Sequence, residues 1–159
     1  MRRFQHGRDR GFTLIELLFV MLLMGILMAI AIGPWQTYGR RQAHIGSTRA
    51  LVSVLRNSQV NAVAEEATYR VDFAPDGRSV RVFRLTAGVW EPKNTETITD
   101  STITYLSPAF LDPNGVTGTS AYFYARGSGS TGSVTVVGSD TSKRYTVTVE
   151  GLTARVSYS

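Results

Sequence analysis

The apolar stretch from Gly11 to Gly33 constrains this chain more than any other feature, and its sequence is GFTLIELLFVMLLMGILMAIAIG. Glu16 is its one charged residue, and residues 17–32 carry no polar side chain. As an α-helix, residues 12–33 would be about 33 Å long, close to the roughly 30 Å of a hydrocarbon core. A helix that is apolar on every side needs lipid or other apolar helices around it. The stretch therefore predicts a segment that is covered by a membrane or by helices of its own kind.

Two details distinguish this stretch from a simple anchor. Glu16 lies five residues into the apolar run, counting from Phe12, and a short basic leader ends at Gly11. An ionisable group at membrane depth is costly, so its presence indicates a function and a specific partner. If the chain is cut after Gly11, the new α-ammonium of Phe12 lies one helical turn from Glu16. Glu16 could pair with its own amine or with that of a neighbouring subunit, and the second pairing would stack helices in register.

The order Gly11-Phe12-Thr13-Leu14-Ile15-Glu16, followed by the apolar helix, resembles the class III signal of type IV prepilins and type II secretion pseudopilins. In that family a prepilin peptidase in the membrane cuts after the glycine and methylates the new N-terminal phenylalanine. The resemblance implies that Gly11 is the cleavage residue and that Phe12 becomes the methylated N-terminus. It also implies that Glu16 is the carboxylate that sets the register of assembly.

Two simpler interpretations compete with this one. A conventional secretory signal has an apolar core of about 7–15 residues and an A-x-A cleavage site, which Ala29-Ile30-Ala31 would supply. The apolar stretch before that site is too long, however, and Glu16 interrupts it. The second alternative is a transmembrane anchor that is never cut. Both would leave Glu16 without a role.

Charge and cysteine content limit the remaining options. Four arginines and one aspartate give residues 1–11 a net charge of +3, so the rest of the chain carries only +2 of the total of +5. Basic residues before a membrane helix favour a cytoplasmic N-terminus and place the C-terminal part outside. We therefore expect a single pass through the inner or cytoplasmic membrane. The chain has no cysteine, which excludes a disulfide scaffold and thiolate metal sites.

A second helical pattern follows the apolar stretch. Pro34 predicts a kink or an end there, and Trp35, Tyr38, Arg40 and Arg41 suit a membrane–water boundary, although ordinary helix aromatics are the alternative. Beyond them, apolar residues recur at spacings of three, four or seven, which indicates an amphipathic helix that continues the first one. They are Ile45, Leu51, Val52, Leu55, Ala62 and Val63.

From residue 68 the pattern changes to the alternation of β-strands. Residues 69–73 and 80–84 alternate around the turn Pro75-Asp76-Gly77-Arg78, which predicts a hairpin. Residues 86–97 are rich in turn formers, with Trp90 as the expected buried anchor, and 108–118 are expected to form a loop. Further strands are expected at 102–106, 121–125, 133–137, 144–150 and 153–158.

The fold class that follows is α+β: a long N-terminal helix, half membrane-spanning and half amphipathic, on a C-terminal antiparallel sheet or sandwich. The expected segments are a leader at 1–11, an assembly helix at 12–34, an amphipathic helix at 35–66 and a β-rich domain at 67–159.

This second half resembles the GspH/FimT-type minor pseudopilins and minor pilins. The resemblance is carried by Leu51–Arg56 with Ala62–Glu66, then strand, Asp76-Gly77 and strand, with weaker support from Phe123–Gly127 and Val147–Val156. It implies a long N-terminal helix with two antiparallel β-sheets.

The motifs of enzyme chemistry are weak. Gly127–Gly132 fits G-x-G-x-x-G, but the apolar run after it predicts a strand where a nucleotide site needs a helix, so a hairpin loop is favoured. His44 is the one histidine after the leader and is expected at a solvated helix position. Asp100, Asp112 and Asp140 are too dispersed for a calcium loop and suit turns. We expect no enzyme activity, no cofactor and no metal, although an enzyme held on a membrane stalk is the formal alternative.

DNA binding needs separate consideration, because some FimT-type minor pilins bind DNA during uptake. The DNA-binding variants resemble one another in a Gly-Arg-x-Arg element, where this chain has Gly151-Leu152-Thr153-Ala154-Arg155. A small basic patch could be formed by Lys143, Arg144 and Arg155. However, a net charge of +2 outside the leader gives little electrostatic attraction for nucleic acid. An ordinary solvated face is favoured.

The sequence therefore predicts a structural minor pilin or pseudopilin of a type IV pilus or a type II secretion system. Its expected partners are the prepilin peptidase, the membrane and other pilin-like subunits, which it contacts through the N-terminal helix. The alternative is a minor pilin that binds DNA for natural transformation.

Overall fold

A computed structural model describes residues 12–98, 103–138 and 144–159, with the backbone alone at 32–37. The chain divides into two compact units, an N-terminal unit of residues Met1–Gly39 and a C-terminal unit of residues Arg40–Ser159. Each unit is described by itself. The leader predicted at 1–11 lies outside the described residues.

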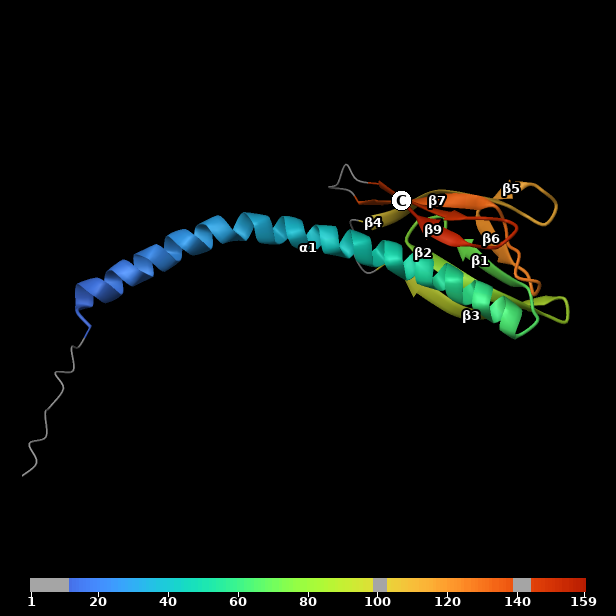
Figure 1. The fold of residues 1–159 in the computed structure, drawn as a ribbon, viewed down its shortest axis with the longest axis horizontal. Helices are drawn as coiled ribbons and strands as arrows, with labels where there is room; N and C mark the ends of the chain where they lie inside the picture. The colour runs from blue at the N-terminus through green and yellow to red at the C-terminus, as the bar shows by residue number, and fades with distance from the viewer. Residues whose placement is uncertain (1–11, 99–102, 139–143) are drawn as a thin grey trace, which may run out of the picture. The chain divides into compact units, whose positions relative to one another are not determined.

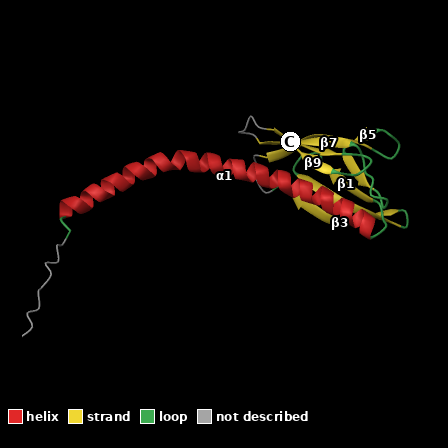
Figure 2. Cartoon of the chain, viewed as in Figure 1, coloured by secondary structure: helices red, strands yellow, loops and turns green. Residues whose placement is uncertain are grey.

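One helix, α1 (Leu14–Ala64), contains both the apolar and the amphipathic patterns. It is the long ribbon that runs from blue to green in Figure 1 and is red in Figure 2. The expectation that the amphipathic segment continues the first helix is confirmed, because the helix is assigned without interruption through Pro34. Proline removes one backbone donor from the ladder, and the helix continues here despite that loss.

The C-terminal unit contains two antiparallel sheets, as expected. Sheet A has the strand order β3-β2-β1-β6, and sheet B has the order β5-β4-β7-β8-β9. The strands of sheet A are β1 (Tyr69–Phe73), β2 (Ser79–Thr86), β3 (Val89–Thr97) and β6 (Ser120–Phe123). Those of sheet B are β4 (Ile103–Leu111), β5 (Thr117–Gly118), β7 (Gly132–Gly138), β8 (Arg144–Val149) and β9 (Val156–Tyr158).

The predicted hairpin is confirmed: β1 pairs with β2 with Val71 opposite Val82. The turn-rich prediction for 86–97 is wrong, because most of this segment is the strand β3. Its turn-like composition is tolerated because β3 is an edge strand, where Pro92 interrupts no central ladder, and a register shift between Val82 and Phe83 accommodates it. Trp90 is half-buried and not a core anchor.

Two further boundaries differ from the prediction. The loop expected at 108–118 begins later, because β4 continues past Pro108 to Leu111 through a bulge between Leu106 and Ala109. The strand expected at 153–158 is only Val156–Tyr158, since the residues before it form a tight turn in which Ala154 has a φ of 48°. A bulge or a turn changes the local backbone without a strong signal in the side-chain pattern.

The core is formed by the inward residues of both sheets and one face of α1. The buried helix residues are Leu51, Val52, Val54, Leu55 and Ala62. Of the residues predicted for this face, Ile45 is half-buried and Val63 is 47% exposed, so Val63 was placed on the wrong side. The strand residues of the core include Val71, Phe73 and Val80 from sheet A and Val134, Val136 and Val147 from sheet B.

Candidate functional site

The N-terminal unit presents an apolar surface that it does not cover itself. Residues Leu14–Ala31 have a mean hydropathy of 2.7 and are long and apolar enough to cross a membrane, and none of them is buried. Leu14, Ile15 and Met28 are between 71% and 83% exposed. An apolar patch of this size on a soluble protein marks a surface that contacts lipid or protein.

The residues predicted for processing and assembly lie at the start of this surface. Phe12 is 82% exposed, and Glu16 lies in the first turn of α1. The Glu16 amide donates to the Thr13 hydroxyl oxygen at 3.3 Å. Thr13 followed by Glu16 at the third helical position is the sequence of a capping box. Gly11 lies outside the described residues, so the cleavage position stays a prediction.

Sequence analysis did not identify this cap. The Thr-x-x-Glu spacing before an apolar run is a signal for such a cap. The carboxylate of Glu16 was instead assigned only to assembly, because a charge within an apolar run is unusual. Among the described residues the Glu16 carboxylate forms no ion pair. A helix N-terminus also favours a negative charge nearby, so Glu16 suits α1 even before any neighbour is considered.

The prediction for His44 is wrong, because it is 2% exposed and not solvated. Its Nε2 lies 3.1 Å from the carbonyl oxygen of Val136 in β7, and its ring packs edge-on against Tyr145. His44 precedes the buried Leu51 by seven residues, so helical spacing places both on one face. This contact ties α1 to sheet B and gives the histidine a structural role.

Other polar helix residues also contact sheet B and the turn before its edge strand. The Arg56 guanidinium donates to the Val156 carbonyl, and the Gln59 amide donates to the Thr153 carbonyl, each at 3.0 Å. These partners lie far apart in sequence, so periodicity alone gives no signal for them. Among the described residues, no group of three or more histidine, cysteine or acidic side chains could hold a metal ion.

The basic patch considered for DNA is not brought together among the described residues. The two arginines lie at opposite ends of β8. Arg144 is the first residue of this strand and pairs with Val137. Arg155 lies beyond the last residue, where its carbonyl accepts a hydrogen bond from the Glu150 amide. β8 has six residues, so at about 3.4 Å each the two arginines are roughly 20 Å apart along it. Both are exposed, and Lys143 lies outside the described residues.

The glycine motif is no nucleotide site, but the prediction of a hairpin loop for it is wrong. A strand and not a helix follows it, but Gly127–Gly132 leads from β6 in sheet A to β7 in sheet B, and strands of different sheets form no hairpin. Of the three aspartates, Asp112 is described and forms the turn that was expected. One Asp112 carboxylate oxygen accepts from the amides of Asn114 and Val116 at 2.8 Å, as an Asx turn requires. Asp100 and Asp140 lie outside the described residues.

Comparison with known proteins bears on both units. Residues 6–32 match the prokaryotic N-terminal methylation motif. The fold is similar to that of the minor pseudopilin EpsH from the type 2 secretion system of Vibrio cholerae. The TM-score is 0.58 at 13% identity over 71% of this chain and 93% of that one. A second EpsH structure gives 0.57 at 14% identity, over 75% and 94%.

The fold is equally similar to a type IV minor pilin, FimU from Pseudomonas aeruginosa. Its TM-score is 0.56 at 14% identity over 78% of this chain and 90% of that one. Among curated protein sequences, none matches this chain. Identities this low establish the fold, while the methylation motif is a separate observation in the sequence of the N-terminal unit.

The N-terminal unit therefore carries a prokaryotic N-terminal methylation motif, and the chain has an α+β fold of the pilin-like kind. Within that class, its fold is the one shared by the minor pseudopilin and minor pilin structures described above.

Proposed function

We propose that this chain is a minor subunit of a type II secretion pseudopilus or a type IV pilus, with a role in protein secretion or pilus assembly. A prepilin peptidase cuts it after Gly11 and methylates Phe12. Before assembly, α1 holds it in the inner or cytoplasmic membrane with the C-terminal unit outside. The observation that carries this proposal is the uncovered apolar surface of Leu14–Ala31, which lies within the methylation motif matched at residues 6–32.

Physical chemistry supports a transfer of this helix from lipid into a filament. Lipid tails are as apolar as the side chains of Leu14–Ala31, so exchanging lipid for neighbouring helices changes little hydrophobic free energy. Close packing and specific polar pairing then determine the neighbours. Glu16 is the one charge in this surface, so it is the residue that can fix the register between helices.

The two candidate machines are supported equally. Similarity to EpsH and to FimU differs by only 0.02 in TM-score, and both comparisons cover similar shares of this chain. The DNA-uptake alternative rests on arginines that sheet B separates, so the proposal stays with assembly.

Replacement of the cleavage glycine tests the processing step. Gly11→Val should leave the full-length precursor in the membrane, because a branched side chain would occupy the position beside the scissile bond. Immunoblotting of membranes from the native host measures the size of the product, with Gly25→Val as the matched control inside the helix. A mature-sized Gly11→Val product would contradict the assignment of the cleavage residue.

Glu16 has two roles that substitution can separate. Glutamine can replace glutamate in a capping box, whereas it carries no charge. Glu16→Gln should therefore keep the helix start and normal cleavage but fail to enter filaments, as should Glu16→Ala. Recovery of each variant with assembled filaments and with membranes gives the measurement. If Glu16→Gln assembles like the wild type while Glu16→Ala does not, the residue acts as a cap and not as a charge.

A further inference from the structure

The last strand of sheet B, β9, has one edge without a strand partner. β9 ends the strand order of sheet B and pairs with β8 alone. Ser159 and Thr146 exchange both of their backbone hydrogen bonds, at 3.1 and 3.0 Å. Because hydrogen-bonded and non-hydrogen-bonded pairs alternate in an antiparallel ladder, the pairs that contain Val156 and Tyr158 are non-hydrogen-bonded. The backbone amides and carbonyls of these two residues therefore point away from β8.

Helix α1 contacts this edge at one end only. The Arg56 guanidinium binds the Val156 carbonyl, and Gln59 binds the Thr153 carbonyl in the turn before β9. The Tyr158 amide and carbonyl form no hydrogen bond with a described residue. A row of unpaired backbone groups on an edge strand is a template for pairing with another chain. The Tyr158 end of β9 is thus open to a further strand.

A groove lies between this open end and α1, with a volume of about 370 Å³. Tyr158 forms one side, and the other side is formed by Arg49, Val52, Ser53, Arg56 and Asn57. The helix residues follow spacings of three and four, so they form one helical face. Tyr158 is two residues after the buried Val156, so its side chain lies on the same face of β9. The groove has space for about twelve water molecules at about 30 Å³ each, which the side chains of an added segment could fill.

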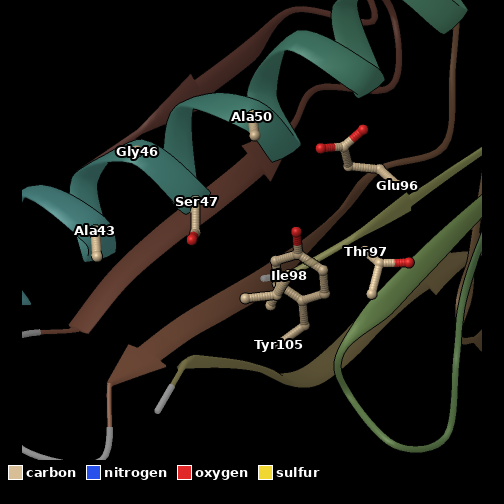
Figure 3. Close-up of a pocket in the computed structure, with 8 residues that line it drawn as sticks. All are labelled: Ala43, Gly46, Ser47, Ala50, Glu96, Thr97, Ile98 and Tyr105. Atoms are coloured by element: carbon tan, nitrogen blue, oxygen red, sulfur yellow. The ribbon is translucent and has the colours of Figure 1, made fainter. Parts of the chain in front are cut away.

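The charge of this groove is positive. Arg49 and Arg56 lie on it, and none of its described lining residues is acidic. Helical rise separates the two arginines by about 10.5 Å. Arg49 forms no ion pair with a described residue. A separate groove beside α1, shown in Figure 3, has the opposite character, because Glu96 is the one charged residue among its described lining residues.

We propose that the open edge of β9 binds an extended acidic segment of a partner protein, which adds to sheet B as a further strand. The backbone of the segment pairs with Tyr158, and its carboxylates pair with Arg49 and Arg56 across the groove. In this mode of recognition main-chain hydrogen bonds give affinity and side-chain positions give specificity. Arginine binds carboxylates through short, charge-assisted hydrogen bonds, whereas a basic segment would be repelled. The inference concerns the C-terminal unit and does not depend on the proposed assembly of α1.

Peptide binding to the full chain in detergent micelles tests the proposal. The probe is Thr-Thr-Glu-Thr-Glu-Thr-Thr, which favours an extended strand and places both glutamates on one face. The matched control peptide has lysine in place of both glutamates. Fluorescence anisotropy of the labelled peptides should show at least roughly tenfold tighter binding of the acidic one. No binding of the acidic peptide, or equal binding of the two, would overturn the proposal.

A charge substitution locates the site. Arg49→Leu should weaken binding of the acidic peptide roughly tenfold, which corresponds to about 1.4 kcal/mol. Arg81→Leu is the matched control, since it removes the same charge at an exposed position of β2 outside the groove and should bind like the wild type. Equal binding by the two variants would show that the peptide binds elsewhere.

Tyr158→Pro tests the addition of a strand. Proline removes the amide that points away from β8 and no bond of the ladder, so the C-terminal unit should stay folded while the acidic peptide binds roughly tenfold more weakly. Tyr158→Ala keeps the amide and should bind more tightly than Tyr158→Pro. In the wild-type chain, which needs no substitution, bound peptide should slow hydrogen exchange of the Tyr158 amide. Unchanged exchange with peptide bound would contradict strand addition.

Other occupants would give different results. A single-stranded oligonucleotide that binds as tightly as the acidic peptide, and more weakly to Arg49→Leu, would show a general anion site. Dimers of the chain that Tyr158→Pro abolishes would make a second copy the occupant. Either result would overturn the proposal. A chain that binds the acidic peptide but never enters filaments would contradict the proposed function alone, so the two failures are distinguishable.

Discussion

Helix α1 contains two segments that differ in whether the rest of the chain buries their apolar side chains. In Leu14–Ala31 every residue is exposed, although the segment is almost wholly apolar. In the C-terminal unit, from Arg40 onwards, α1 is apolar on one face only, and Leu51 and Leu55 on that face are fully buried. The second segment is covered by its own chain, whereas the first requires lipid or other subunits. One helix is thus covered by its own chain in one part and left uncovered in the other.

The treatment of polar groups differs in the same way. In the buried face, the Thr48 hydroxyl donates to the His44 carbonyl at 2.9 Å, and the Ser58 hydroxyl donates to the Val54 carbonyl at 2.8 Å. Each buried hydroxyl is satisfied within one helical turn, as burial requires. In Leu14–Ala31 the one polar side chain is that of Glu16, and its carboxylate forms no ion pair with a described residue.

The largest difference should appear when one leucine is shortened in each segment. Leu55→Ala removes fully buried side-chain volume and should lower the free energy of unfolding by about 2 to 5 kcal/mol. Leu22→Ala, at a residue 57% exposed, should change it by less than about 0.5 kcal/mol. Urea unfolding of the full chain in detergent micelles gives both values. Equal effects would show that the C-terminal unit does not depend on its own helix face.

A smaller effect should follow from breaking the link between α1 and β7. His44→Leu removes the donor to the Val136 carbonyl and should cost about 1 to 3 kcal/mol. Arg49→Leu, at an exposed helix position, is the control and should stay within about 0.5 kcal/mol. If the two variants unfold at the same urea concentration, the histidine contact contributes nothing to the covered segment.

The smallest effect concerns pH. Burial raises the pKa of Tyr69 and of Tyr105 to about 12, with Glu65 and Glu96 respectively as the next causes. Between about pH 10 and 12 the unfolded chain loses protons that the folded chain keeps. Stability should therefore be complete below pH 10 and then fall gradually as the pH rises towards 12.

Tyr105→Phe should reduce that slope when urea midpoints are compared at pH 9, 10.5 and 11.5. A slope unchanged by the substitution would exclude Tyr105 as a source of the pH dependence.

The parts that sequence analysis could predict depend on local patterns. The motif Gly11–Glu16, the apolar run, the β1–β2 hairpin and most of the buried helix face all have signals within a few residues. The edge strand β3 was not predicted because its residues do not alternate between apolar and polar. Almost all of them, including those around Pro92, are exposed. An edge strand is specified by its partner, here β2, more than by its own side chains.

The parts that could not be predicted depend on contacts between distant residues. His44 contacts Val136 across 92 positions, and Gly46 of α1 lines the same pocket as Tyr105 of β4. Helical spacing can place His44 and Gly46 on faces of α1, but it does not say which face a sheet will cover. The capping role of Thr13 and Glu16 was predictable, because its signal lies within one helical turn.

The central proposal is that the mature chain begins at a processed Phe12, two residues before the uncovered segment Leu14–Ala31. Mass spectrometry of the N-terminal peptide, from protein purified from the native host, tests this most directly. The account predicts a peptide that begins with N-methylated Phe12. A peptide that begins at Met1 would show an uncut anchor, and one that begins at Ile32 would show ordinary export. Either result would contradict the assembly role assigned to Leu14–Ala31 and Glu16.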